Sequence, residues 1–162
     1  MSATLKLFGL SLLLFAAYLV GAGYSSYCKK RLSQLEAFVL LITHINKEIT
    51  LFLSTQGNIL SGFENSTIDE FIEKVGEIGN LYDAFCAVCG NFCLSENMKE
   101  KLKAYFFDFG SNYREGELMR TKLFLSEVSE DLKREEQTAP NRIRLAYTLI
   151  FALSLSIVII LL

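Results

Sequence analysis

The chain has 162 residues, a length that allows one modest domain, and 51% of them are hydrophobic. Its 16 basic and 18 acidic residues give a net charge of −2, but residues 32–141 alone hold ten basic and 18 acidic residues, a balance of −8. An acidic surface of this kind argues against DNA or RNA as a partner, because nucleic-acid binding relies on basic side chains that neutralise phosphates.

The first element in the chain is an uncharged apolar run from Leu7 to Tyr24. As a helix, about 18 residues extend for about 27 Å, which is close to the thickness of the hydrocarbon core of a bilayer. We therefore predict a transmembrane helix over residues 5–25.

A cleavable signal peptide is the alternative for this run. Lys6, the apolar stretch and the small residues of Val20-Gly21-Ala22 follow in the order that such a peptide needs. The basic residues Lys29, Lys30 and Arg31 come directly after the run, and they favour a retained helix because they resist translocation.

Residues 29–139 are predicted to form an acidic helical bundle, which starts with a long helix over residues 31–54. Its apolar residues recur at spacings of three and four: Leu32, Leu35, Val39, Ile42, Ile49 and Leu53, widened by Phe38, Leu41, Ile45 and Phe52. So broad a face predicts packing on more than one side. We expect this helix to continue directly from the first apolar run and to end at Gln56-Gly57-Asn58.

The next elements are predicted from cap signals. A short helix carrying Ile59, Leu60 and Phe63 follows the break. Thr67, with Glu70 three residues later, has the spacing of a capping box and predicts the start of another helix. Asn65-Ser66-Thr67 is also a glycosylation sequon, although the cap is the preferred interpretation.

Glycines and one serine mark the following boundaries. Gly76 and Gly79 should divide this helix from one over residues 81–92, and Ser95 should cap a further helix that ends at Gly110. The inward-facing residues of that further helix are predicted to be Met98, Leu102, Tyr105, Phe106 and Phe109.

The last long helix of the bundle is predicted over residues 113–137. Leu118, Thr121, Leu125, Val128 and Leu132 keep a heptad spacing, and acidic residues cover the other faces. Pro140 is expected to break or kink the chain after it. A second uncharged run over residues 145–162 is predicted to be another transmembrane helix.

The flanking charges predict the topology. Lys29, Lys30 and Arg31 follow the first apolar run, and Arg142 and Arg144 precede the second, whereas Lys6 is the one basic residue at the other end of the first run. Basic residues concentrate on the cytoplasmic side of membrane proteins. We therefore expect the middle domain to be cytoplasmic and both chain ends to lie across the membrane.

Three cysteines, Cys86, Cys89 and Cys93, form a CxxCxxxC run. On one helix face they could hold a metal or an iron–sulfur cluster. Cysteine is also a small apolar residue that fills cores, and the interleaved Phe85 and Phe92 favour that role. We therefore predict packing residues and no metal site.

No other pattern indicates catalysis. The single histidine, His44, stands in an apolar-rich helix without a nucleophile or acid of a triad nearby, so a structural role is expected. The glycines fit neither a Walker loop nor a dinucleotide-binding motif. We expect no enzyme activity, no cofactor and no small-molecule substrate.

The arrangement as a whole resembles the stage III sporulation protein AB family of endospore-forming bacteria. The residues that carry the resemblance are Leu5-Lys6-Leu7-Phe8-Gly9 at the start, Arg31 before the first bundle helix, Glu48-Ile49, and Phe109-Gly110 before the long charged helix. The resemblance extends over essentially the full length and depends on layout more than on one sharp motif.

The resemblance implies a fold and a role. Family members are similar to the cytoplasmic helix-bundle domains of the inner-membrane platform protein of type II secretion and type IV pilus machines. They are implied to serve as non-enzymatic platform subunits in the secretion-like channel complex between mother cell and forespore, with the middle domain on the mother-cell side. The implied partners are a cytoplasmic secretion-type ATPase, stage III sporulation protein AA, and other membrane subunits.

The expected partner-binding residues are Glu70, Glu73 and Glu77, because they belong to a shorter helix that a partner standing off the membrane could reach. Two other functions stay open. One is a surface protein with a cleaved signal peptide and a C-terminal membrane or lipid anchor, in which Asn65 would be glycosylated. The other is a small membrane enzyme or metal protein built on the clustered cysteines.

Overall fold

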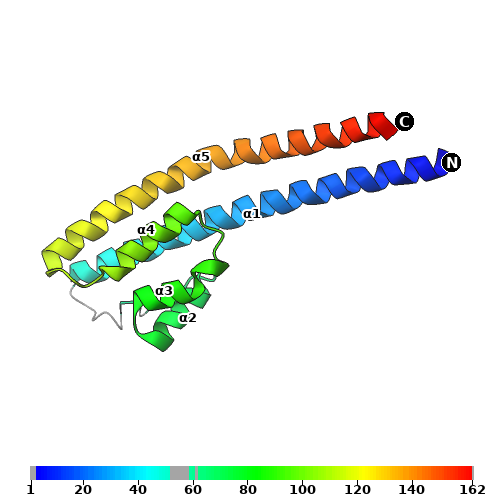
Figure 1. Cartoon of the computed structure of the whole chain (residues 1–162). Coiled ribbons are helices and arrows are strands. Elements are labelled where there is room, and N and C mark those ends of the chain that lie inside the picture. Colours follow the sequence, from blue (N-terminus) through cyan, green and yellow to red (C-terminus); the bar gives the residue numbers. More distant parts are fainter. Residues whose placement is uncertain (1–2, 52–58, 61, 162) are drawn as a thin grey trace. The chain divides into compact units, whose positions relative to one another are not determined.

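The computed structural model describes residues 3–51, 59–60 and 62–161 (Figure 1). Its elements in chain order are α1 (Ala3–Leu51), α2 (Asp69–Ile78), α3 (Leu81–Val88), the 3₁₀ turn η2 (Cys89–Asn91), α4 (Glu96–Phe107) and α5 (Arg114–Leu161). The described part of the chain contains no strand. The prediction of an all-α fold with a long apolar helix at each end is confirmed.

The chain divides into two compact units. The first, called here the span unit, combines Met1–Lys30 with Glu135–Leu162, and the second, called the bundle unit, is Arg31–Arg134. Since α1 is one helix from Ala3 to Leu51, the predicted continuation of the first apolar run into the first bundle helix is confirmed.

The core of the bundle unit is a cluster of phenylalanine rings. Phe38 of α1 lies at its centre, with ring centroids 5.6 Å from Phe85 of α3 and 5.3 Å from Phe92, both in edge-to-face geometry. Phe71 of α2 stacks on Phe106 of α4 at 5.4 Å. All five rings are buried. Because one cluster draws on α1, α2, α3 and α4, it fixes these helices against one another.

The two long helices meet at the loop end of the bundle unit. Arg114, the first residue of α5, donates from Nε to the carbonyl oxygen of Ile49 at 3.0 Å and from Nη2 to that of Thr50 at 2.5 Å. These carbonyls belong to the last turn of α1 as the structure describes it. The contact therefore joins this turn to the first residue of α5, the antiparallel neighbour of α1 (Figure 1).

The start of α2 differs from the predicted capping box. The helix begins at Asp69, and Ile68 occupies the N-cap position without a side-chain hydrogen bond. Thr67 instead donates its backbone N–H to Oδ1 of Asn65 at 3.0 Å, which makes a local turn. The capping prediction is wrong because Ile68 is fully buried in the core, and its burial sets where the helix starts.

The other predicted boundaries are partly right. Gly79 has a φ of 75° and ends α2, as expected for a left-handed C-cap, whereas Gly76 lies inside α2. Asn80 then caps α3 by accepting hydrogen bonds from the next helical N–H groups. α3 ends at Val88 rather than near Phe92, and the 3₁₀ turn η2 fills the remainder.

α4 follows the sequence prediction closely. Ser95 accepts the N–H of Met98 through Oγ at 3.2 Å, and Gly110 has a φ of 80° after the helix ends. The five residues predicted to face inward are all buried: Met98, Leu102, Tyr105, Phe106 and Phe109.

Pro140 was predicted to break or kink the chain, and α5 continues through it without a break. Proline has no N–H, and the carbonyl of Glu136 loses one helical hydrogen bond there. The helix persists on both sides of the missing bond. The predicted break at residues 56–58 lies outside the described residues, while Ile59 and Leu60 next to it are buried in a turn.

Candidate membrane-spanning and partner-binding sites

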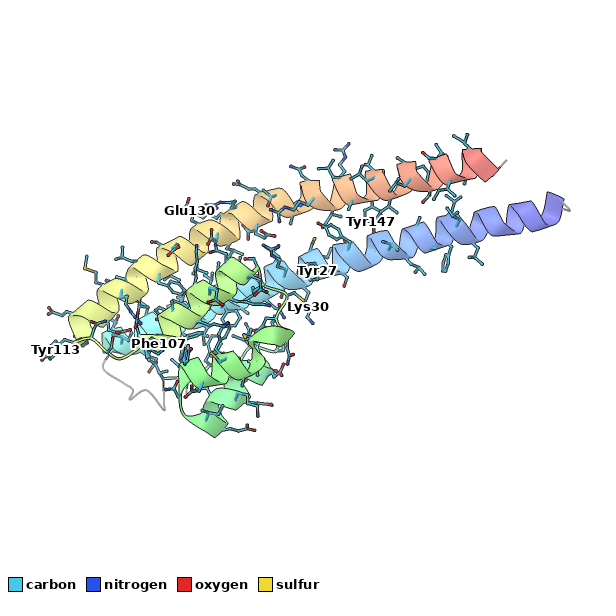
Figure 2. The ribbon with its side chains drawn as sticks, in the orientation of Figure 1. Tyr27, Lys30, Phe107, Tyr113, Glu130 and Tyr147 are labelled. Carbon is cyan, nitrogen blue, oxygen red and sulfur yellow. The ribbon has the colours of Figure 1, made fainter. Side chains whose placement is uncertain are left out.

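The two helices of the span unit make their closest approach at Gly21. A Cβ atom placed on this glycine would lie 2.4 Å from Cε1 of Tyr147 on α5, a distance that side-chain atoms do not reach. Gly21 is buried, and Tyr147 lies on the side of α5 that faces α1 (Figure 2). A glycine at this position therefore lets a tyrosine ring lie directly on the backbone of α1.

This contact places Gly21 of the first uncharged run beside Tyr147 of the second. In an antiparallel pair, the residues that follow Gly21 run alongside those that precede Tyr147. The C-terminal end of the first run and the N-terminal end of the second therefore lie at the same end of the span pair.

Away from the contact between Gly21 and Tyr147, most apolar side chains of the span unit are exposed. Over each apolar window only 11% is buried, and both long helices have the length and composition of membrane spans. The exposed apolar residues include Leu12, Phe15, Val20, Leu149, Phe151 and Leu153. These two candidate membrane-spanning helices fit a two-span membrane protein.

The five basic residues predicted to set the topology occupy different settings. Lys29, Lys30 and Arg144 are exposed in the span unit, and Arg31 is half-buried in the bundle unit. Arg142 forms an ion pair with Glu135, with Nη1 at 3.2 Å from Oε1. The topology itself stays a prediction.

The predicted partner-binding acids lie on one exposed face of α2. Glu70 accepts a hydrogen bond from Nδ2 of Asn91 at 2.6 Å, and Glu77 pairs with Lys74 at 2.5 Å. Glu73 is exposed between them. The side chains recur at three and four residues, so the face is a continuous acidic strip.

An exposed aromatic residue that the sequence did not single out lies on α4. Phe107 is 68% exposed, and its ring makes an edge contact with Tyr82 of α3 at 5.1 Å between centroids. We call Tyr82 and Phe107 the aromatic patch. Figure 2 labels Phe107 at the C-terminal end of α4.

The sequence profile of the family described as stage III sporulation protein AB matches residues 6–162. The chain belongs to the stage III sporulation protein AB family. No curated protein and no solved structure shows significant similarity to it. Membership in this family supports a role in stage III of sporulation, and the match includes both candidate membrane spans.

The clustered cysteines of this family member do not share one buried face. Cys86 is exposed, so the prediction that it fills the core is wrong, and Cys89 and Cys93 are half-buried. Phe85, Val88 and Phe92 supply the inward face in their place. Among the described residues, no group of three or more His, Cys, Asp and Glu side chains has the arrangement of a metal site.

His44 has a structural setting, as expected. It is half-buried on α1, and its ring lies 5.3 Å from that of Phe63.

A polar network ties α4 to α5 inside the bundle unit. Tyr105 and Thr121 share a buried hydrogen bond of 3.1 Å between their hydroxyl oxygens. Arg120 donates to the carbonyl of Tyr105 at 2.8 Å and pairs with the buried Glu117 at 3.2 Å. Burial raises the pKa of Tyr105 to about 12, although its hydrogen bond to Thr121 acts in the opposite direction. The network positions the two helices against each other.

Proposed function

We propose that this protein is a non-enzymatic membrane platform subunit whose cytoplasmic bundle unit docks the secretion-type ATPase of the sporulation complex, stage III sporulation protein AA. In this proposal the two apolar helices cross the cell membrane, and the bundle unit faces the mother-cell cytoplasm. Other membrane subunits of the channel complex would contact the span unit.

The observation that carries the docking proposal is the exposure of Phe107. The side chain of Phe107 is 68% exposed, so its apolar surface is in contact with water. That surface is removed from water only when another molecule covers it. Aromatic residues of this kind contribute most of the binding energy at protein interfaces. Tyr82 supports the Phe107 ring from one side, so the ring is held in place before a partner arrives.

The acidic strip on α2 supplies the second part of the proposed docking surface. α2, which carries the strip, packs through Phe71 on Phe85 of α3, the helix that carries Tyr82. Charges at the rim of an interface mainly speed the encounter and set its salt dependence, whereas buried aromatic residues slow dissociation. The two parts of this surface therefore predict separate kinetic effects.

A retained first span is favoured over a cleaved signal peptide. α1 runs as one helix through Val20-Gly21-Ala22, and Gly21 is buried against Tyr147. Cleavage there would remove the α1 half of the span pair. N-terminal sequencing of the membrane-bound protein tests this choice, and an intact first segment is the expected result.

The docking test compares Phe107→Ala with Tyr113→Ala, using the full chain in lipid nanodiscs and the purified ATPase. Tyr113 is 95% exposed but lies outside the aromatic patch, so it is a matched control. We expect Phe107→Ala to raise the Kd about 30-fold, as for a loss of about 2 kcal/mol, and Tyr113→Ala to leave it within about twofold. Equal Kd values for wild type and Phe107→Ala would remove the patch from the interface.

The charge test reverses Glu70, Glu73 and Glu77 together. We expect a slower association rate and a flatter dependence of that rate on salt. The control reverses three exposed acids of α5: Glu115, Glu130 and Glu136. Equal association rates at every salt concentration would exclude the α2 strip.

The topology test labels a cysteine introduced at Asn112, which is exposed in the bundle unit. In a variant without the four native cysteines, a membrane-impermeant maleimide added to intact cells should not react. Ready labelling would place the bundle unit outside and favour the anchored surface protein.

A further inference from the structure

We infer that the span unit binds the anionic headgroups of phospholipids through Lys29, Lys30 and Arg144, beside the exposed rings of Tyr24 and Tyr27. We call these five residues the basic collar. This inference rests on the proposed membrane location, and it concerns the lipid rather than the protein partner of the span unit.

The antiparallel span pair brings the basic residues of two distant chain segments to one zone. Tyr24 follows Gly21 by three residues and Arg144 precedes Tyr147 by three, so both lie at the same end of the antiparallel pair. Lys30 lies six residues beyond Tyr24 on α1, about 9 Å of helical rise. Side chains lean toward the N-terminus of their own helix. Those of Lys29 and Lys30 therefore lean back toward the apolar run. The side chain of Arg144, on the antiparallel helix, leans away from it, so the charges converge from both sides.

The charges of the collar are available to a ligand. The only acids of the span unit are Glu135 and Glu136, and Glu135 holds Arg142 in an ion pair at 3.2 Å. Lys29, Lys30 and Arg144 are exposed and make no ion pair with any described residue. Three cations at the end of an uncharged apolar surface match the anionic phosphates that border the hydrocarbon of a bilayer.

Aromatic residues mark the same zone. Tyr24 and Tyr27 are 39% and 47% exposed and lie at the end of the apolar run. Tyrosine prefers the membrane interface because its ring is apolar and its hydroxyl group is polar. Tyr27 and Lys30 are three residues apart, so a headgroup can contact the ammonium while its glycerol backbone contacts the ring (Figure 2).

The proposed occupant is a membrane lipid, because the collar continues directly into exposed apolar side chains of the kind that acyl chains cover in a bilayer. Each basic residue near an anionic surface contributes about a fivefold gain in association. Three such residues are expected to give a clear preference for anionic over zwitterionic lipid at the surface of the protein.

The test uses the full chain reconstituted in mixed vesicles, with spin-labelled phosphatidylglycerol and phosphatidylcholine as probes. We expect wild type to prefer phosphatidylglycerol at least about fivefold, and the preference to fall as salt rises. The triple variant Lys29→Gln, Lys30→Gln, Arg144→Gln should lose it. The control, Lys47→Gln, Lys122→Gln, Lys133→Gln, removes three exposed lysines of the bundle unit and should keep it.

The remaining outcomes contradict the inference, and each one identifies the part of it that fails. An unchanged preference in the collar variant, or an equal loss in the control, would overturn the collar. A loss of preference when inorganic phosphate replaces chloride at equal ionic strength would indicate a site for free phosphate instead. Extraction of the chain from vesicles by alkaline carbonate would overturn the membrane location and the inference together, whereas a failure of ATPase docking alone would leave the lipid preference intact.

Discussion

The bundle unit and the span unit differ in the exposure of their large apolar side chains. In the bundle unit Phe38, Phe71 and Phe85 are fully buried against one another. In the span unit Phe15 and Phe151 are 61% and 60% exposed, and a glycine provides the tight contact. The difference indicates two solvents: water drives rings together in one unit, whereas lipid leaves close packing of small residues as the main source of helix association in the other.

The strongest test of this comparison removes one ring from each unit. Phe85→Ala deletes a side chain that contacts four other rings, and it should destabilise the bundle unit by about 3–5 kcal/mol. The measurement is hydrogen exchange of amides in α3 and α4, in the full chain in nanodiscs. Phe15→Ala is the control and should leave those rates unchanged. A similar loss of protection in both variants would mean that the two units do not differ in this way.

A second test uses pH to probe burial in the bundle unit. The pKa of Tyr105 is raised to about 12 by burial, from an ordinary value of 10.0. Above pH 10 the unfolded chain releases this proton while the folded chain keeps it, so stability is complete below pH 10 and is lost as pH rises toward about 12. We expect a loss of about 2–3 kcal/mol over this range.

Unfolding by urea across this pH range measures the loss. Tyr105→Phe should flatten the dependence of stability on pH, and Tyr113→Phe, which changes an exposed tyrosine, should not. If both variants behave alike, Tyr105 does not titrate as a buried group.

The third test addresses the span pair. Gly21→Val places a branched side chain where Tyr147 lies and should weaken helix pairing by about 1–3 kcal/mol. The buried Cys28 reports the change, because a membrane-permeant maleimide should react with it at least about fivefold faster.

Gly23→Val is the matched control for this test, since a Cβ on Gly23 meets nothing within 4 Å. Both variants should carry serine in place of the other three cysteines. Equal Cys28 reactivity in the two variants would show that Gly21 is not the point of close approach.

The smallest effect is expected at an ion pair of the bundle unit. Lys101 of α4 lies 2.8 Å from both Glu127 and Asp131 of α5. Lys101→Met should cost up to about 1 kcal/mol, because partly exposed ion pairs contribute little. Lys103→Met is the control, since Lys103 pairs with Glu100 within α4. A larger loss in the control, measured by urea unfolding, would contradict the role of Lys101 as a link between helices.

The sequence predicted those features that depend on neighbouring residues. The cap at Ser95, the left-handed glycine at Gly110, the helix boundary at Gly79 and the inward face of α4 were all correct, because each follows from local hydrogen bonding or from one helical period. The start of α2 was missed because the burial of Ile68, a tertiary effect, outweighed the cap signal at Thr67.

Features that depend on distant residues could not be predicted. The exposure of Phe107 is not evident beside the buried Phe106 and Phe109, because the neighbouring helices decide which ring they cover. Ala17 and Gly21, four residues apart, indicate a place where another helix can approach closely, but the partner, Tyr147 near the other end of the sequence, required the structure. The acids of α2 were found from the sequence, but the aromatic patch required the structure.

The central position of Phe38 also has a consequence for the order of synthesis. This ring and its neighbours on α1 are translated well before Phe71, Phe85 and Phe92, which cover them. A nascent chain therefore carries a bare apolar helix face next to its first candidate span until most of the bundle has left the ribosome. Such an interval favours aggregation or contact with a chaperone. The bundle can close only after α3 and α4 emerge, so slow translation after α1 should lower the yield of folded protein.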